Sequence, residues 1–178
     1  PDLMTVTSVQ TRELSEQGSH TISLFVHDRP GVLVRVALVF SRRGYNIESL
    51  VVSPAASGGF PRMTITCSGE TATLDQIILQ LAKLVDVVSA IDHTGDEAYE
   101  TEIALIKLDV EDESRTKVLQ IAEHFNARVV DYAAKSIVLR VYGSSEKLDA
   151  LISLLLPSGV GELVRSGKIL MARGSQST

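Results

Sequence analysis

Residues 27–50 read HDRPGVLVRVALVFSRRGYNIESL, and the fold of this 178-residue chain can be worked outward from them. The alternating residues just before this stretch predict a β-strand, and the apolar spacing that follows Gly31 predicts an amphipathic helix. Pro30 suits the first turn of this helix, because its missing N–H would have no partner there. Gly31 has no Cβ, so another molecule can approach the free backbone N–H groups at the helix start. Such a helix start can hold a carboxylate.

The pattern of the first half predicts six elements in the order strand, helix, strand, strand, helix, strand. They span residues 22–26, 33–43, 47–53, 63–67, 74–85 and 87–91. Arg42 and Arg43 favour the negative end of the first helix, and Gly44 fits the position just past it. Thr73 and Gln76 have the spacing of a capping box before the second helix. This order of elements is the split β-α-β pattern of ferredoxin-like folds.

The second half repeats this order of elements without repeating the residues. Its elements are predicted at residues 104–110, 118–125, 129–133, 137–142, 148–155 and 169–171. Gly159 and Gly161 leave the position of the last strand open. The predicted fold class is therefore α+β, with two ferredoxin-like βαββαβ domains. We expect an N-terminal extension at residues 1–18, domains at 19–93 and 102–174, and a polar linker at 94–101.

The composition limits the classes of function. A net charge of −5 with 4% aromatic residues argues against broad nucleic-acid binding, which needs basic surface and stacking side chains. Apolar runs stay well short of the roughly 20 residues of a membrane span, and the first residues contain no signal-peptide core. Cys67 is the only cysteine, so an internal disulfide and a cysteine-cluster metal site are both excluded. We expect a cytoplasmic protein without membrane or nucleic-acid partners.

Catalytic patterns are absent from the sequence. The histidines are scattered without metal-ligand spacing, and the chain has no phosphate loop, GxGxxG or GxSxG motif. Cys67 alternates with Met63 and Ile65, which indicates a core residue rather than a nucleophile. The acidic cluster at residues 109–113 indicates favourable charge at a helix start, with a divalent-metal site as the weaker alternative. The strand at residues 62–67 has no aromatic residue, which argues against an RNA-binding domain of this topology.

Several longer strings resemble a known family. DRPGVL (residues 28–33) after a strand resembles the ACT domains, which are regulatory modules that bind amino acids. FSRRGYNIESLVVSP, RMTITCSG and QLAKLVDVVSAID, which begin at residues 40, 62 and 80, are more specific. They are similar to the regulatory small subunit of acetolactate synthase, also called acetohydroxyacid synthase. EIALIKL, KLDALI and VRSGKILMARG, which begin at residues 102, 147 and 164, resemble the C-terminal domain of that subunit.

The resemblance implies a non-catalytic subunit that binds and activates the acetolactate synthase catalytic subunit. It also implies feedback inhibition of valine, leucine and isoleucine biosynthesis by branched-chain amino acids, chiefly valine. In the family, two ACT domains pair as a homodimer with the effector at their interface. No cofactor is expected in this chain, and the catalytic partner is expected to carry thiamine diphosphate, magnesium and FAD. The alternative is a stand-alone ACT-domain sensor that regulates another enzyme or transcription, but the chain has no helix-turn-helix segment.

Seven residues form the effector-binding set that the resemblance implies: Asp28, Gly31, Val32, Leu33, Asn46, Ile47 and Val52. One protomer would offer backbone contacts at its helix start, the other would supply Asn46 and Ile47, and Val52 would line an apolar slot. A free amino acid needs these three kinds of group: an anion site, an acceptor for its ammonium group and an apolar pocket. Many family members have Asn where this chain has Asp28. An ionised Asp pairs with the ammonium group but repels the carboxylate, and a helix N-cap is its alternative role.

Overall fold

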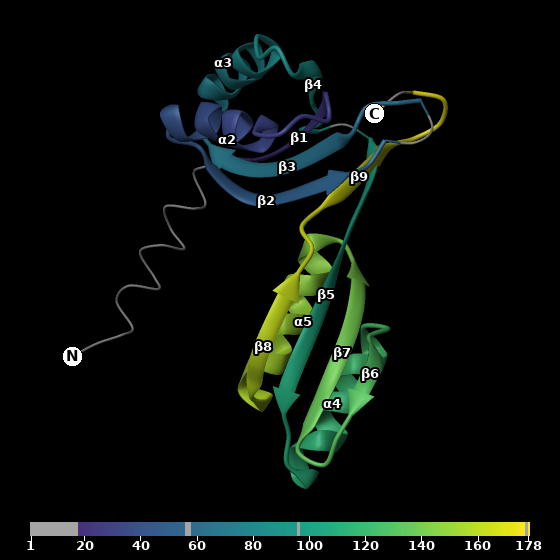
Figure 1. Ribbon diagram of the computed structural model, residues 1–178. Helices are drawn as coiled ribbons and strands as arrows, with labels where there is room; N and C mark the ends of the chain where they lie inside the picture. Colours follow the sequence, from purple (N-terminus) through teal and green to yellow (C-terminus); the bar gives the residue numbers. More distant parts are fainter. Residues whose placement is uncertain (1–17, 56–57, 96, 177) are drawn as a thin grey trace, which may run out of the picture. The chain divides into compact units, whose positions relative to one another are not determined.

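The computed structural model describes residues 18–55, 58–95, 97–176 and 178, and the chain forms two compact units (Figure 1). The first unit ends at Ala98 and also takes in the tail from Ala172 onward. The second unit runs from Tyr99 to Met171. The expected N-terminal extension lies outside the described residues except for Gly18.

In the first unit, two helices cover one face of a four-stranded antiparallel sheet (Figure 1). The elements in chain order are β1 (Gly18–Val26), α2 (Val32–Arg42), β2 (Asn46–Ser53), β3 (Arg62–Gly69), α3 (Thr71–Ala82) and β4 (Val87–Asp92). The strand order across the sheet is β2-β3-β1-β4, so β2 and β4 are its edges. Leu24, Val36, Phe40, Ile65 and Ile77 belong to the buried core of this unit. Burial of each such side chain contributes roughly 1.5–3 kcal/mol to folding.

The alternation of side chains gives this sheet two different faces. Leu24 of β1 points to the helices, whereas Thr21 and Ser23 lie on the other face and are also buried. Thr66 and Thr64 of β3 lie directly opposite Thr21 and Ser23. Small hydroxyl side chains therefore line the centre of the helix-free face of the first sheet.

The second unit repeats this arrangement. Its elements are β5 (Ala98–Asp109), α4 (Asp112–His124), β6 (Arg128–Tyr132), β7 (Ser136–Gly143), α5 (Ser145–Leu155), the 3₁₀ turn η1 (Leu156–Ser158), β8 (Val160–Arg165) and β9 (Ile169–Ala172). The strand order is β6-β7-β5-β8, which matches the order of the first sheet, and β9 pairs with β5 beside this path. Both units therefore have the ferredoxin-like fold, which confirms the predicted fold class.

The fourth strand of the second sheet is not the predicted one. It is β8 (Val160–Arg165), whereas the predicted strand at residues 169–171 forms the additional strand β9. Gly159 has a φ of 89° at the turn into β8, and a Cβ there would lie 2.9 Å from the carbonyl oxygen of Asp109. A Cβ on Gly161 would lie 3.0 Å from the Asp109 carboxylate. The two glycines thus allow β8 to approach β5 closely, and they do not interrupt the sheet.

The starts of two helices also differ from the prediction. Thr73 lies inside the first turn of α3, and this helix has no side-chain cap hydrogen bond, so the capping box predicted from Thr73 and Gln76 is wrong. A capping box is found instead at α4, where the backbone N–H of Glu111 donates to Ser114 Oγ at 3.2 Å. The acidic cluster at residues 109–113 therefore belongs to a capped helix start, where negative charge is favourable.

Candidate functional site

The start of α2 leaves backbone donors free. Gly31 is the N-cap residue, with a φ of 84° and a ψ of −2°, and its carbonyl oxygen accepts the Arg35 N–H at 3.1 Å. Pro30 precedes this turn, so the expectation that it occupies the first helical turn is wrong. Within the described chain, the structure records no acceptor for the N–H groups of Leu33 and Val34. Two free donors at the positive end of the helix dipole favour an anion at this position.

Two arginines and one carboxylate surround this helix start. Asp86, at the junction of α3 and β4, accepts a hydrogen bond from Arg35 and lies 3.7 Å from Arg29 Nη1. The Asp86 side chain is almost entirely buried, whereas both guanidinium groups are substantially exposed. The backbone N–H of His27 donates to the Asp86 carbonyl oxygen at 2.8 Å, which fixes the loop before α2. The two guanidinium groups exceed the buried Asp86 by one positive charge, which favours an anion beside the free N–H groups and which the exposed Asp28 carboxylate partly offsets.

These three charged residues were not among the predicted site residues. Arg35 carried a usable signal, because a residue four positions after Gly31 lies one turn above it on the same helix face. Arg29 lies within the DRPGVL string itself. Asp86 is more than fifty residues away in the chain, and no local pattern connects it to the helix start.

Asp28 and Gly31 have different places at this turn. Asp28 is exposed and makes no cap hydrogen bond, so its alternative role as the helix N-cap is wrong. Gly31 occupies left-handed backbone that an L side chain rarely adopts, and an added Cβ would lie 3.1 Å from Arg35 Nη1. Glycine is therefore required here for the backbone turn as well as for open access to the N–H groups.

The remaining predicted site residues fall into two groups. The Val32 side chain is buried in the core, so Val32 can offer a ligand only its backbone. The Leu33 side chain is 44% exposed. Val52, near the end of β2, lies opposite Met63, on the helix-covered face and at the end of the sheet where α2 begins. Asn46 and Ile47 begin β2 at the opposite end of the sheet, and Asn46 and Val52 are six positions apart on this extended strand. That separation is roughly 20 Å, at about 3.3 Å per residue.

One protomer therefore cannot bring the whole predicted set around a single amino acid. The residues at the helix start and Val52 lie at one end of the sheet, and the residues Asn46 and Ile47 lie at the other. A ligand of amino-acid size spans only a few ångströms. Contact with both groups requires a second copy of the chain.

The side of α2 that is free of arginine offers a surface for such a copy. The Arg35 side chain lies on the flank of α2 that faces Asp86, in the loop between α3 and β4. Leu33, Val34 and Leu38 lie on the remaining surface and are 44–61% exposed. Among the described residues, β2 pairs only with β3, so its other edge has unpaired backbone groups. Exposed apolar residues beside an open strand edge are typical of a protein interface.

Cys67 and two of the histidines lie in the interior of the first unit. Burial raises the pKa of the Cys67 thiol to about 12, so the cysteine is an inert core residue, as predicted. His20 and His93 are both buried, and His93 Nε2 lies 2.8 Å from Ser23 Oγ. Nowhere in the described chain do three or more His, Cys, Asp or Glu side chains gather as a metal-binding group. No described helix has the length and apolar content to cross a membrane.

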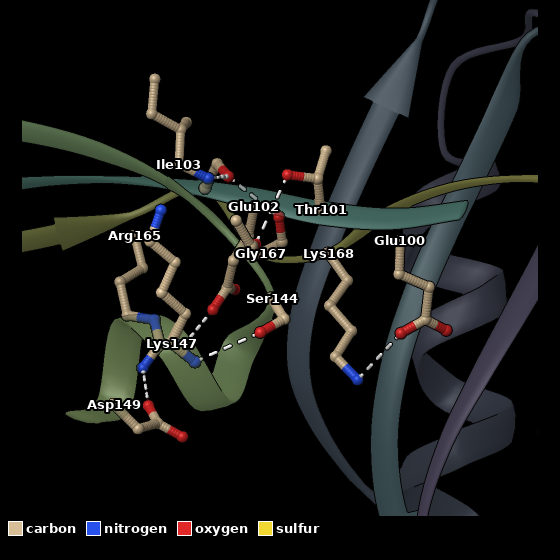
Figure 2. Close-up of polar contacts among 12 residues, drawn as sticks. Glu100, Thr101, Glu102, Ile103, Ser144, Lys147, Asp149, Arg165, Gly167 and Lys168 are labelled. Carbon is tan, nitrogen blue, oxygen red and sulfur yellow. Dashed lines mark hydrogen bonds and ion pairs between the residues drawn. The ribbon is translucent and has the colours of Figure 1, made fainter. Parts of the chain in front are cut away.

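The densest group of polar contacts lies in the second unit (Figure 2). Arg165 of β8 forms ion pairs with Glu102 of β5 and Asp149 of α5, and Glu102 is only 5% exposed. Lys168 pairs with Glu100 at 3.3 Å. Each charge already has a partner, so this group fastens β5, β8 and α5 together and is not a reaction site.

Comparison with known families gives two matches that together cover most of the chain. Residues 22–89 match the model of the acetohydroxyacid synthase (AHAS) small subunit-like ACT domain. Residues 101–174 match the model described as the small subunit of acetolactate synthase.

Individual proteins match over nearly their full length. The acetolactate synthase small subunit of Mycobacterium leprae is 42% identical over 156 residues, which cover 88% of this chain and 92% of that protein. The probable acetolactate synthase small subunit of Methanothermobacter thermautotrophicus is 39% identical over 163 residues, with 91% and 97% covered. The crystal structure of the acetolactate synthase small subunit from Thermotoga maritima has a TM-score of 0.79 and 34% identity, and the match covers 89% of this chain and 99% of that one.

Proposed function

The chain belongs to the family of acetolactate synthase small subunits, and on this premise we propose that it binds a branched-chain amino acid, chiefly valine, between two copies of its N-terminal ACT domain. Membership implies a regulatory rather than a catalytic chain, with the catalytic subunit as its partner. The bound amino acid would confer feedback inhibition on a catalytic subunit that the chain otherwise activates. An effector can do this only through different affinities for two states of the complex.

The observation that carries this proposal is the charge pattern at the start of α2. The free N–H groups of Leu33 and Val34, with the positive excess of Arg29 and Arg35 over Asp86, match the carboxylate of an amino acid. Valine also needs an acceptor for its ammonium group and an apolar slot. Asn46 or Asp28 offers the acceptor, and the exposed side chains of Leu33 and Val52 suit the slot.

A two-fold axis beside β2 would bring both groups of site residues together. Antiparallel pairing of β2 with β2 of a second copy sets the Asn46 end of one strand against the Val52 end of the other. The same pairing satisfies the open edge of β2 and can cover the apolar side of α2. Each dimer would then contain two equivalent sites, with Gly31 from one protomer and Asn46 from its partner.

Asp28 is proposed to set the strength of effector binding. It is exposed and is not used as a cap, so its carboxylate is available to the ligand ammonium group. The same carboxylate weakens the attraction of the helix start for the ligand carboxylate. Replacement of Asp28 by Asn is expected to raise valine affinity.

The domain limits remain those proposed from the sequence. An ACT domain at residues 19–93 and a C-terminal domain at 102–174 are separated by a linker at 94–101. The strand β5 already begins at Ala98, so the second half of this linker is extended and hydrogen-bonded backbone.

The test is a thermal unfolding measurement on the isolated chain with and without amino acids. A ligand that binds only the folded state raises the melting temperature, so valine at millimolar concentration should raise it and glycine should not. No shift with valine, leucine or isoleucine would contradict the proposal. A parallel titration of the catalytic subunit should show activation by the chain and reversal of that activation by valine.

A further inference from the structure

The helix-free faces of the two sheets differ, although the two units share one topology. In the first unit this face is lined by small hydroxyl side chains. In the second unit the side chains that point away from α4 and α5 include four large apolar residues, which are 41–62% exposed. They are Ile103, Leu105, Tyr142 and Val164. The ferredoxin-like fold needs apolar residues only on the helix-covered face, so those on the second face require another explanation.

One row of residues across this face is electrostatically unbalanced. Arg128 of β6, Arg140 of β7, Leu105 of β5 and Val164 of β8 lie opposite one another in register. The two arginines form a direct cross-strand pair and both are exposed. Among the described residues, no carboxylate forms an ion pair with either guanidinium group. Like charges directly opposite each other destabilise a sheet.

In the neighbouring row, by contrast, the positive charge has a counter-charge. There, Asp131, Val138, Lys107 and Glu162 lie opposite one another. Lys107 Nζ lies 3.1 Å from Glu162 Oε1, so the positive charge of this row is already matched. The unmatched positive charge therefore belongs to Arg128 and Arg140, next to Leu105 and Val164, while Asp131 on β6 forms no ion pair with either arginine among the described residues.

An ion pair on the helix-covered face of the second sheet fixes the direction of two of the apolar residues. Glu102 and Arg165 are ion-paired on the helix-covered face, between β5 and β8. Because neighbouring residues on a strand point to opposite faces, this pair fixes the outward direction of Ile103 and Val164. Figure 2 shows Ile103 on the other side of β5 from the Glu102 carboxylate. Ile103 and Val164 therefore already point outward before any partner arrives, and a preformed surface lowers the entropy cost of binding.

We propose that this face of the second sheet, made of Ile103, Leu105, Tyr142, Val164 and the Arg128–Arg140 pair, docks a segment of the catalytic subunit in which an apolar side chain is flanked by carboxylates. The apolar side chain covers Leu105 and Val164, and the carboxylates pair with the two arginines. The inference rests on the proposed function, which supplies the catalytic subunit as the partner. It deepens that function by assigning the second unit to assembly and leaving the first to effector binding.

A second copy of this chain fits the face less well. The arginines lie in the same row as Leu105 and Val164, so two copies with these apolar residues in contact would bring arginines rather than carboxylates to the arginines. Of the two carboxylates in the neighbouring row, Glu162 is already paired with Lys107, and Asp131 lies on β6, away from the apolar residues of β5 and β8. An apolar centre with a charged rim that lacks its counter-charge is better matched by a different, acidic surface.

The test compares binding of matched variants of the full chain to the purified catalytic subunit. Arg140→Glu removes one of the two arginines and places a carboxylate opposite the other, and Lys117→Glu makes the same charge change on the exposed surface of α4. We expect at least about tenfold weaker binding for Arg140→Glu and unchanged binding for Lys117→Glu. The melting temperature of Arg140→Glu should be equal to or higher than that of the unaltered chain, because a like-charge pair becomes an ion pair. Loss of binding through misfolding would lower it.

A second pair of variants tests the apolar part of the face. Leu105→Ser is compared with Leu154→Ser on α5, because the two leucines are 44% and 51% exposed. Only Leu105→Ser should weaken binding, again by about tenfold. Unchanged binding by both Arg140→Glu and Leu105→Ser would overturn the inference. Weaker self-association of the isolated chain in either variant would overturn the inference too, because the molecule that covers this face would then be a second copy of the chain.

The outcomes also separate this inference from the proposed function. If the unaltered chain binds the catalytic subunit and the variants bind equally well, only the docking face is wrong. If the unaltered chain does not bind it at all, the proposed function fails together with the docking face. Valine should raise the melting temperature of Arg140→Glu as much as that of the unaltered chain, because the effector site lies in the first unit.

Discussion

Replacement of Gly31 by Asp should weaken effector binding strongly at a small cost in stability. The added Cβ sits on backbone with a φ of 84° and 3.1 Å from Arg35 Nη1. The left-handed conformation costs about 1–2 kcal/mol for an L side chain, at the low end for Asp, and the end of a flexible arginine side chain can shift. In a chain of this size, about 1 kcal/mol lowers the melting temperature by roughly 2–4 °C.

The effect on the ligand should be larger than the effect on the fold. The new carboxylate can pair with Arg29 or Arg35 and occupies the position proposed for the carboxylate of valine. Loss of one charge-assisted hydrogen bond costs about 1.5–3 kcal/mol, which is roughly a 10- to 100-fold loss of affinity. Valine at ten times its dissociation constant stabilises the unaltered chain by about 1.4 kcal/mol, which corresponds to roughly 3–5 °C.

Gly95→Asp is the matched control for this change. Gly95 has a φ of 83°, so Asp at this position meets the same backbone strain, and its added Cβ has no atom within 4 Å. Differential scanning fluorimetry should show the full valine shift for Gly95→Asp and less than about 1 °C for Gly31→Asp, at the same valine concentration. A full shift for Gly31→Asp would refute the assignment of the ligand carboxylate to the start of α2.

Three further predictions concern the interface, the ion pair and the core. Leu38→Arg on the exposed side of α2 should turn the dimer into a monomer in sedimentation experiments, whereas Leu79→Arg on the exposed side of α3 should not. Asp86→Asn should lower the melting temperature, because it weakens a nearly buried ion pair, and should strengthen valine binding in calorimetry, because it frees two arginines. The Cys67 thiol has its pKa raised by burial from 9.0 to about 12, so between these pH values the unfolded chain loses the thiol proton first. The free energy of unfolding in urea should therefore fall as pH rises above 9, by up to about 1.4 kcal/mol per pH unit for this group, and Cys67→Ala should remove that slope.

The periodicity of the sequence was sufficient to predict both folds, because each helix and most strands carry one apolar face. The position of the last strand could not be predicted, because glycines at residues 159 and 161 are typical of a turn, whereas Gly161 here allows a close approach to Asp109. That approach depends on which strand becomes the neighbour, which local sequence does not encode. Pro30 does not lie in the first turn of α2, because Gly31 is the N-cap residue in left-handed backbone and the helix begins only at Val32.

The candidate site was predicted in part. The helix start follows from Gly31 and its surroundings, but the role of Asp86 depends on a contact between distant parts of the chain. The distance of roughly 20 Å between Asn46 and Val52 follows only once both residues are known to lie on one extended strand. The apolar surface of the second sheet had a signal that was overlooked. The run EIALIKL is apolar on both faces of its strand, which in an antiparallel sheet indicates that both faces are covered.

A mixed dimer gives the most direct test of the central claim, that each effector site combines Gly31 of one protomer with Asn46 of its partner. One chain carries Gly31→Asp and the other carries Asn46→Ala, and valine binding is measured by isothermal titration calorimetry. Each variant alone should form a dimer that does not bind valine, because both of its sites are defective. The mixed dimer should bind one valine, since one of its sites retains both native residues. No binding by the mixed dimer would mean that each site lies within a single protomer, which would contradict the account.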